Sequence, residues 1–147
     1  MRKLIVLPLI LAIFGLVGIS SAHDEHVAIV KSVTGAVEVV RSDEKLPAEP
    51  GMQLIRADKI VSGSESEAGI VFIDGTLITV GSSTEIEVSE YLFEPKEAKY
   101  DFLLYVKKGS AIYSSGRLGK LAPDAVNLKT PRATVGIRGT RFIVKVE

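Results

Sequence analysis

Past residue 26 the chain is a succession of short segments rich in valine and isoleucine, each ended by glycine, aspartate, serine or proline. Branched side chains favour extended backbone, and turn residues at this spacing are typical of all-β domains. The segments that we expect to be strands are residues 27–32, 36–41, 53–56, 59–61, 68–73, 77–80, 84–92, 110–113, 125–129, 134–137 and 141–146. The sequence therefore predicts one compact all-β domain over residues 27–147, with about ten to twelve short strands arranged as a roll, a sandwich or a short β-solenoid.

Three segments need separate interpretation. Residues 68–73 (AGIVFI) are apolar on both faces, which predicts that residues 70–73 lie in a central strand that is covered on both sides. Residues 46–51 (LPAEPG) predict a rigid loop, because two prolines restrict the backbone. Residues 94–109 carry the end signals of a helix, but the aromatic and branched run at 102–106 also suits a buried strand. We favour a polar loop followed by a strand at 102–106, ending in a turn at Gly109.

The first 22 residues have the layout of a secretory signal peptide. A basic start is followed by an apolar run from Leu4 to Ile19 and by the small residues Ser20, Ser21 and Ala22. We expect cleavage after Ala22 and a flexible tail over residues 23–26. The alternative is an uncleaved membrane anchor, since the apolar run is close to the minimum spanning length.

The bulk composition excludes several classes of function. Cleavage removes Arg2 and Lys3, which leaves 16 basic and 18 acidic side chains in 125 residues. This balance gives no electrostatic footprint for nucleic acid, and the length suits one domain. The chain has no cysteine, so no disulfide framework, thiol nucleophile or zinc–thiolate site is available. We expect a soluble periplasmic or secreted protein that meets a membrane only if the signal stays uncleaved.

Two stretches nearly repeat each other: IDGTLITV at residues 73–80 and IRGTRFIV at residues 137–144. A strand, an Asp-Gly pair and a second strand is the strongest short hairpin signal. We therefore interpret Gly75 and Gly139 as glycines of two equivalent corners, each with an unusual φ that alanine would resist. A further hypothesis is an ion pair between Asp74 and Arg138 that ties the corners together.

No pattern of residues indicates catalysis. The only histidines are His23 and His26, in the tail HDEH, which is a weak candidate for copper, nickel or zinc but is better interpreted as a solvated tail. The acidic residues are scattered, and no glycine-rich phosphate loop is present. We expect no enzyme activity, metal or cofactor. The aromatic residues of the middle region are expected to pack in the core or an interface; they are Tyr91, Phe93, Tyr100, Tyr105 and Tyr113.

The order of these motifs resembles the FecR domain. The resemblance covers about residues 27–146 and is carried by Gly35-Ala36-Val37, Gly51, RADKIVSG at 56–63, Asp74-Gly75-Thr76, Gly81, Gly109, Thr130-Pro131 and Arg138-Gly139-Thr140-Arg141-Phe142. It implies an all-β extracytoplasmic module. In the best-known members this module relays a signal from an outer-membrane receptor to a cytoplasmic sigma-regulating tail. No such region precedes the apolar segment here, so we do not expect the sigma-regulator function to transfer.

The resulting expectation is a non-enzymatic FecR-like module for protein interaction in envelope signalling or assembly. The alternative is a carbohydrate-binding, peptidoglycan-binding or ligand-sensing envelope protein. The motif residues are expected to be structural; they are Gly35, Asp74, Gly75, Thr76, Gly81, Pro131, Arg138, Gly139, Thr140 and Phe142. The candidate interaction residues are Arg141 and Lys145, because a basic strand can be an exposed edge that pairs with a partner.

Overall fold

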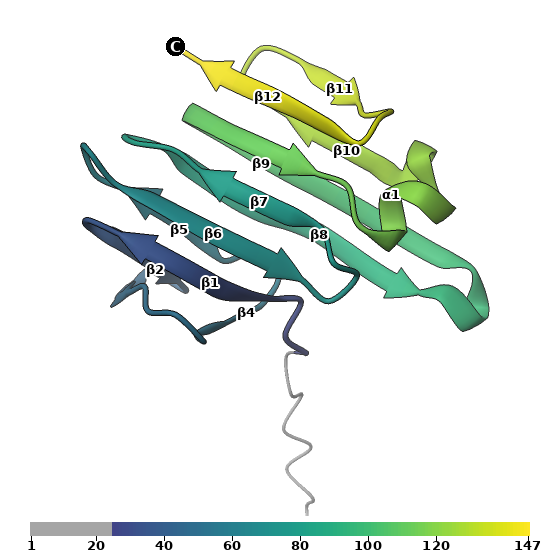
Figure 1. Cartoon of the computed structure of the whole chain (residues 1–147), viewed down its shortest axis with the longest axis horizontal. Helices are drawn as coiled ribbons and strands as arrows, with labels where there is room; N and C mark the ends of the chain where they lie inside the picture. Colours follow the sequence, from purple (N-terminus) through teal and green to yellow (C-terminus); the bar gives the residue numbers. More distant parts are fainter. Residues whose placement is uncertain (1–24) are drawn as a thin grey trace, which may run out of the picture.

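The computed structural model describes residues 25–147, which form an all-β domain (Figure 1). The predicted signal peptide and the first two residues of the predicted tail lie outside the described residues. The described part has a five-residue α-helix, two 3₁₀ turns and twelve strands. The elements are β1 (Ala28–Thr34), β2 (Val37–Arg41), β3 (Glu44–Pro47), β4 (Gln53–Leu54), β5 (Lys59–Ser62), β6 (Glu67–Phe72), β7 (Leu77–Val80), β8 (Glu85–Glu94), η1 (Pro95–Glu97), β9 (Lys99–Ser114), α1 (Arg117–Leu121), η2 (Pro123–Ala125), β10 (Val126–Lys129), β11 (Thr134–Gly136) and β12 (Arg141–Val146).

One continuous sheet curls into two packed layers. Its main path runs β3-β2-β5-β8-β9-β7-β6-β1-β4. The first half of β9 pairs with β8 and β10, and its second half pairs with β7 and β12. The front layer of Figure 1 is therefore β4-β1-β6-β7-β9-β12, and the layer behind it is β3-β2-β5-β8-β9-β10-β11. The sequence allowed a roll, a sandwich or a short β-solenoid, and the structure shows one sheet that curls over on itself as a roll with two packed layers.

The core lies between the layers and follows from the period-two alternation of the strands. Its largest members are aromatic residues from both layers, with ring centroids 5.1 Å apart for Phe72 and Phe102 and 5.1 Å apart for Phe72 and Tyr91. Phe102 also meets the ring of Tyr113 edge-on at 6.1 Å. Complete burial of a large apolar side chain contributes roughly 1.5–3 kcal/mol, so this cluster is a principal source of stability.

The ambiguous segment is a turn followed by a strand. Residues Pro95–Glu97 form a single 3₁₀ turn, and β9 then begins at Lys99. The strand favoured at 102–106 is confirmed, but it is longer than predicted. The expected turn at Gly109 is wrong: β9 continues through this residue to Ser114. Lys108 pairs with β8 in one layer and Gly109 with β12 in the other, so the strand changes layers here.

Two other elements were not expected. Strand β3 includes part of the predicted loop 46–51 and pairs with β2 after a tight turn at Ser42 and Asp43, which both have positive φ (48° and 65°). Helix α1 is short and follows the end of β9. In neither segment do apolar residues recur with the spacing of a strand or a helix. Each segment forms because neighbouring parts of the chain provide hydrogen-bonding partners.

The expectation that residues 68–73 are covered on both faces is only half right. This segment is central, since β6 lies between β1 and β7. Ile70 faces the core and is fully buried, but Val71 is half-buried and Ile73 is 48% exposed. Among the described residues, no element covers the outer side of the front layer. The apolar residues on that side are consequently surface residues.

Candidate functional site

The first Gly-Thr corner joins β6 to β7 as a hairpin. The N–H of Gly75 donates to the carbonyl of Phe72, and the N–H of Phe72 donates to the carbonyl of Thr76. Gly75 has φ of +87°, a conformation that L-residues rarely adopt. The hairpin predicted from the sequence is therefore present.

Asp74 is buried at the centre of this corner. Its carboxylate accepts hydrogen bonds from the Tyr91 hydroxyl (2.8 Å), the Thr76 hydroxyl (2.6 Å), the Leu118 N–H (3.0 Å) and the Thr76 N–H (3.3 Å). The Arg117 N–H also donates to the Asp74 carbonyl at 2.9 Å. A buried carboxylate is tolerated when its oxygens accept several donors. The corner thus fastens α1 and β8 to the front layer, which is a structural role.

The tyrosines around Asp74 stay protonated. Burial, reinforced by the neighbouring Asp74 carboxylate, raises the pKa of Tyr91 far above its usual value. Burial also raises the pKa of Tyr113. Both hydroxyls therefore act as neutral hydrogen-bonding groups near neutral pH. Since Asp74 is 2% exposed and its oxygens are occupied, this cluster offers no group to an external substrate.

The two sequence repeats occupy equivalent positions on either side of β9. Leu77 and Arg141 both pair with Ser114, and Thr79 and Ile143 both pair with Ile112. Strands β7 and β12 therefore run in the same direction and in the same register along the second half of β9. The repeated motif places two matching corners at the same end of one strand.

The second corner is open to solvent, unlike the first. Gly139 has φ of +135°, and Arg138, Gly139 and Thr140 are all exposed. Arg138 forms an ion pair with Asp124, and both side chains are exposed. The hypothetical ion pair between Arg138 and Asp74 is not formed. The carbonyl of Thr140 accepts the N–H of Ser115 at 2.8 Å, which fixes the start of β12.

The remaining motif residues lie at turns or in the packing. Gly35 lies between β1 and β2, and Gly81 lies between β7 and β8. Pro131 is exposed in the connection from β10 to β11. Phe142 is half-buried and stacks on Tyr113, with centroids 5.0 Å apart. These motif residues therefore lie in connections between strands or pack against the core, and their structural role stays a prediction.

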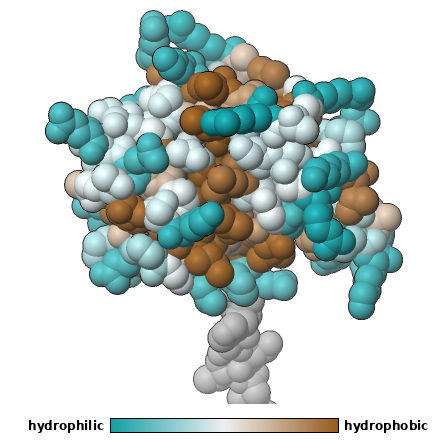
Figure 2. Space-filling model, viewed as in Figure 1, coloured by the Kyte–Doolittle hydropathy of each residue, from teal (hydrophilic) through white to brown (hydrophobic). Residues whose placement is uncertain are grey.

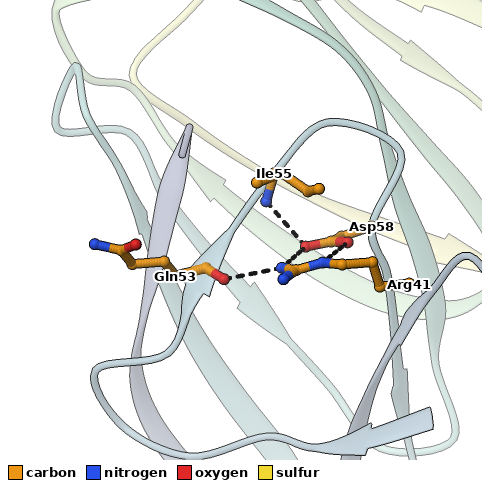
Figure 3. Close-up of polar contacts among 4 residues, drawn as sticks. All are labelled: Arg41, Gln53, Ile55 and Asp58. Carbon is orange, nitrogen blue, oxygen red and sulfur yellow. Dashed lines mark hydrogen bonds and ion pairs between the residues drawn. The ribbon is translucent and has the colours of Figure 1, made fainter. Parts of the chain in front are cut away.

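Asp58 is a second buried carboxylate, which was not identified as a site residue from the sequence. Arg41 binds it through two hydrogen bonds, from Nε to Oδ1 at 2.9 Å and from Nη2 to Oδ2 at 2.6 Å (Figure 3). The Ile55 N–H also donates to Oδ2, and Arg41 reaches the Gln53 carbonyl. Asp58 belongs to the RADKIVSG motif, which was the available signal. Its partner lies on a different strand, and no sequence spacing connects the two.

Arg141 and Lys145 lie on β12 at the edge of the front layer. Their side chains are exposed on its outer side, while Phe142 and Val144 face the core. Within the described chain, β12 pairs with β9 alone. The other edge of β12 is therefore open.

An open groove of about 550 Å³ lies where the chain enters β1. It is lined by Glu25, His26, Val27, Arg56, Ala57, Ile73, Ser89, Glu90, Tyr91, Leu92, Phe93 and Glu94. Of the predicted HDEH tail, His23 and Asp24 lie outside the described residues. From residue 25 onward, no group of three His, Cys, Asp or Glu side chains could hold a metal ion. The groove has mixed charges and no convergent polar cluster.

The five aromatic residues of the middle region divide into two sets. Tyr91 and Tyr113 are buried in the core. Phe93, Tyr100 and Tyr105 are half-buried, with Phe93 6.0 Å from Tyr100 and under the Arg117 guanidinium at 5.3 Å. They do not form one exposed platform. Core packing accounts for two of the five, as the sequence suggested.

The fold and the two corners define a small all-β module held by buried structural carboxylates and carrying an open strand edge. The family model described as FecR protein matches residues 58–147. The chain belongs to the FecR family, and this membership indicates an envelope signalling-related module. No curated protein and no solved structure matches this chain. In the described part, no helix has the length and hydropathy needed to cross a membrane.

Proposed function

We propose that this protein is an exported, non-enzymatic FecR-like module that binds a protein partner in the cell envelope through the open edge of β12. The observation that carries this proposal is the position of β12. It is a full six-residue strand at the edge of the front layer, and it bears Arg141 and Lys145 on its solvent side.

The backbone of β12 is suited to strand addition. The Ser115 N–H bonds the Thr140 carbonyl, so alternation places the bonds to β9 at Phe142 and Val144. The N–H and C=O groups of Arg141, Ile143 and Lys145 consequently point away from β9. An extended partner segment can pair with these groups, and the two cations favour an acidic segment.

Two features favour binding over catalysis. The buried acids Asp58 and Asp74 are both occupied by donors from the chain itself. The candidate histidine His26 lies in an open groove, and from residue 25 onward no three potential metal ligands gather around it. The signal-peptide pattern of residues 1–22 supports export, and the proposed location is the periplasm or the exterior.

The test is crosslinking of the purified protein to an envelope extract from its own source. Arg141→Glu reverses one edge charge, and Lys129→Glu is the matched control because Lys129 is exposed on β10 of the other layer. We expect a defined envelope protein that is captured by the wild type and by Lys129→Glu, and is lost with Arg141→Glu. Capture of murein or polysaccharide alone, or equal capture by all three proteins, would contradict the proposal.

A further inference from the structure

The outer sides of the two layers differ in chemistry. The back layer presents charged residues, which include Glu38, Lys59, Glu85, Glu87, Lys107 and Lys129. The front layer presents apolar residues, and we call this surface the front face. Its apolar members are Ile29, Val71, Ile73, Leu77, Ile112 and Ile143, and its polar members include Thr79. In Figure 2, hydrophobic residues run through the middle of this side of the molecule, with hydrophilic residues between and around them.

The exposed fractions on the front face are large for isoleucine. Ile143 is 63% exposed, Ile73 is 48% exposed and Ile29 is 39% exposed. Single exposed apolar residues are common, but a contiguous patch that is framed by charges marks an interaction surface. The strand pairing shows that these residues are contiguous.

The registers arrange the front face into three rows that cross the strands. The first row is Ile29, Val71, Leu77, Ser114 and Arg141. The second row is Ser32, Gly69, Thr79, Ile112 and Ile143. The third row is Glu67, Gly81, Ser110 and Lys145. Glu67 and Gly81 lie directly beyond the last pair of β6 and β7, Gly81 bonds to Ser110, and Ser110 pairs with Lys145.

The line between β7 and β9 divides each row into two halves. In the second and third rows, residues at equal distances from this line are complementary in size or in charge. In the second row the large residues Ile112 and Ile143 lie on one side of this line, and the small residues Thr79 and Gly69 lie at the matching places on the other. In the third row Lys145 and Glu67 occupy matching places. Both side chains are exposed, and neither has an ion pair within residues 25–147.

We propose that a second copy of this chain packs on the front face, with a two-fold axis that runs parallel to the strands between β7 and β9. The axis brings Ile112 over Thr79 of the second copy and Ile143 over Gly69 of the second copy. It also places Glu67 opposite Lys145 of the second copy, and the symmetry forms this pair twice. In the second and third rows each large side chain thus meets a small one and each charge meets its opposite, whereas in the first row Arg141 lies over Val71 of the second copy.

The size of the front face suits a reversible dimer. The axis overlays four strands of each copy, and four strands at about 4.8 Å spacing with three rows at about 7 Å give a footprint of roughly 400 Å² per copy. The total of roughly 800 Å² is in the range of weak, transient association rather than of a stable dimer. This inference goes beyond the proposed function, because it concerns the purified protein alone and the face of the sheet rather than the edge of β12.

The experiment is sedimentation equilibrium on the protein purified as its cell exports it, with the N-terminus identified by mass spectrometry. We expect a concentration-dependent dimer for the wild type. Glu67→Lys and Lys145→Glu each place two like charges opposite each other. The dimer dissociation constant of each variant alone should therefore rise at least about tenfold. An equimolar mixture of the two variants should restore the dimer, because opposite charges then face each other in the mixed pair.

Lys129→Glu is the control for a general effect of charge, and equal thermal midpoints establish that the variants fold. Ile143→Asp is a second variant, expected to abolish the dimer through the apolar row. A monomeric wild type, a dimer that tolerates both charge variants, or a mixture that stays monomeric would overturn the proposal. A wild-type protein that is monomeric but still captures an envelope partner would overturn this inference and leave the proposed function standing.

Discussion

Two buried aspartates hold this fold together by different means. Asp58 faces a guanidinium, whereas Asp74 is surrounded by neutral donors from three separate parts of the chain. The second arrangement depends on the carboxylate accepting every bond, since Asp74 forms no ion pair within residues 25–147. The Asp of the Asp-Gly-Thr corner is therefore the residue whose chemistry is most restricted.

The first prediction concerns Asp74→Asn. An amide has the same shape but turns two acceptor sites into donors, so two of the present donors lose their acceptor. We expect a loss of about 3 kcal/mol in the free energy of unfolding, measured by urea denaturation. Asp124→Asn is the control, because its ion pair with Arg138 is exposed and should contribute at most about 1 kcal/mol. Equal effects of the two substitutions would contradict the prediction.

The second prediction concerns alkaline pH. The raised pKa of Tyr91 means that the folded state requires the neutral phenol. Its contribution to stability is complete below the unfolded-state pKa of about 10 and is lost as the pH rises above it, by about 1.4 kcal/mol per pH unit. Tyr91→Phe should therefore lower stability at pH 7, by about 1–3 kcal/mol, but should flatten the decline between pH 10 and pH 11.5. Urea denaturation across this range is the measurement, and parallel pH curves would exclude the role of Tyr91.

At the scale of elements, β9 organises the molecule. Each half of β9 is paired on both sides, one half in each layer, so a single strand couples the two layers. The transition between the halves occurs at Gly109, which has φ of +89°. A Cβ atom there would lie 2.5 Å from the Thr84 Cα atom, which is backbone and cannot rotate away.

The third prediction compares glycine substitutions in and beside this element. Gly75→Ala and Gly139→Ala have positive φ but open space around the new methyl group, so each should cost about 1 kcal/mol. Gly109→Ala adds a collision with the backbone of Thr84 and should cost about 3 kcal/mol or more. Thermal and urea unfolding of the three variants provide the comparison. Equal losses would show that φ alone decides and that the close approach is unimportant.

At the scale of the whole molecule, the sandwich is closed unevenly. The side of β12 and β11 is loosely covered, with β11 exposed throughout and the inward residues of β12 only half-buried. The aromatic cluster of the core lies further inside and is more completely buried. Because local stability follows burial, the β12 side should open before the rest.

The fourth prediction tests this uneven closure. Phe142→Ala removes the ring that stacks on Tyr113 and should cost about 2 kcal/mol, less than a fully buried aromatic residue. Hydrogen exchange should accelerate strongly in residues 141–146 and much less in residues 85–94. Phe93→Ala is a suitable control, since Phe93 is also half-buried but lies at the far end of β8. A uniform increase over the whole domain would mean that both layers open as one unit.

The sequence by itself determined the class of fold and the positions of most strands, because these depend on local alternation and turn residues. Strand β7 and strand β12 were placed correctly at residues 77–80 and 141–146, where apolar and polar residues alternate or follow a Gly-Thr corner. It also identified the corners and the family. The sequence did not predict β3, because its residues are mostly polar and it forms a strand only by antiparallel pairing with β2.

Only the tertiary structure decided what the motif residues do. The two corners are alike in sequence, yet one is buried around Asp74 and the other is open, because α1 and β8 cover only the first. The length of β9, the pair formed by Arg41 and Asp58, and the exposure of the front face likewise depend on segments that are distant in sequence. Local patterns specify which residues extend and which turn, but the burial of a side chain depends on what the rest of the chain brings against it.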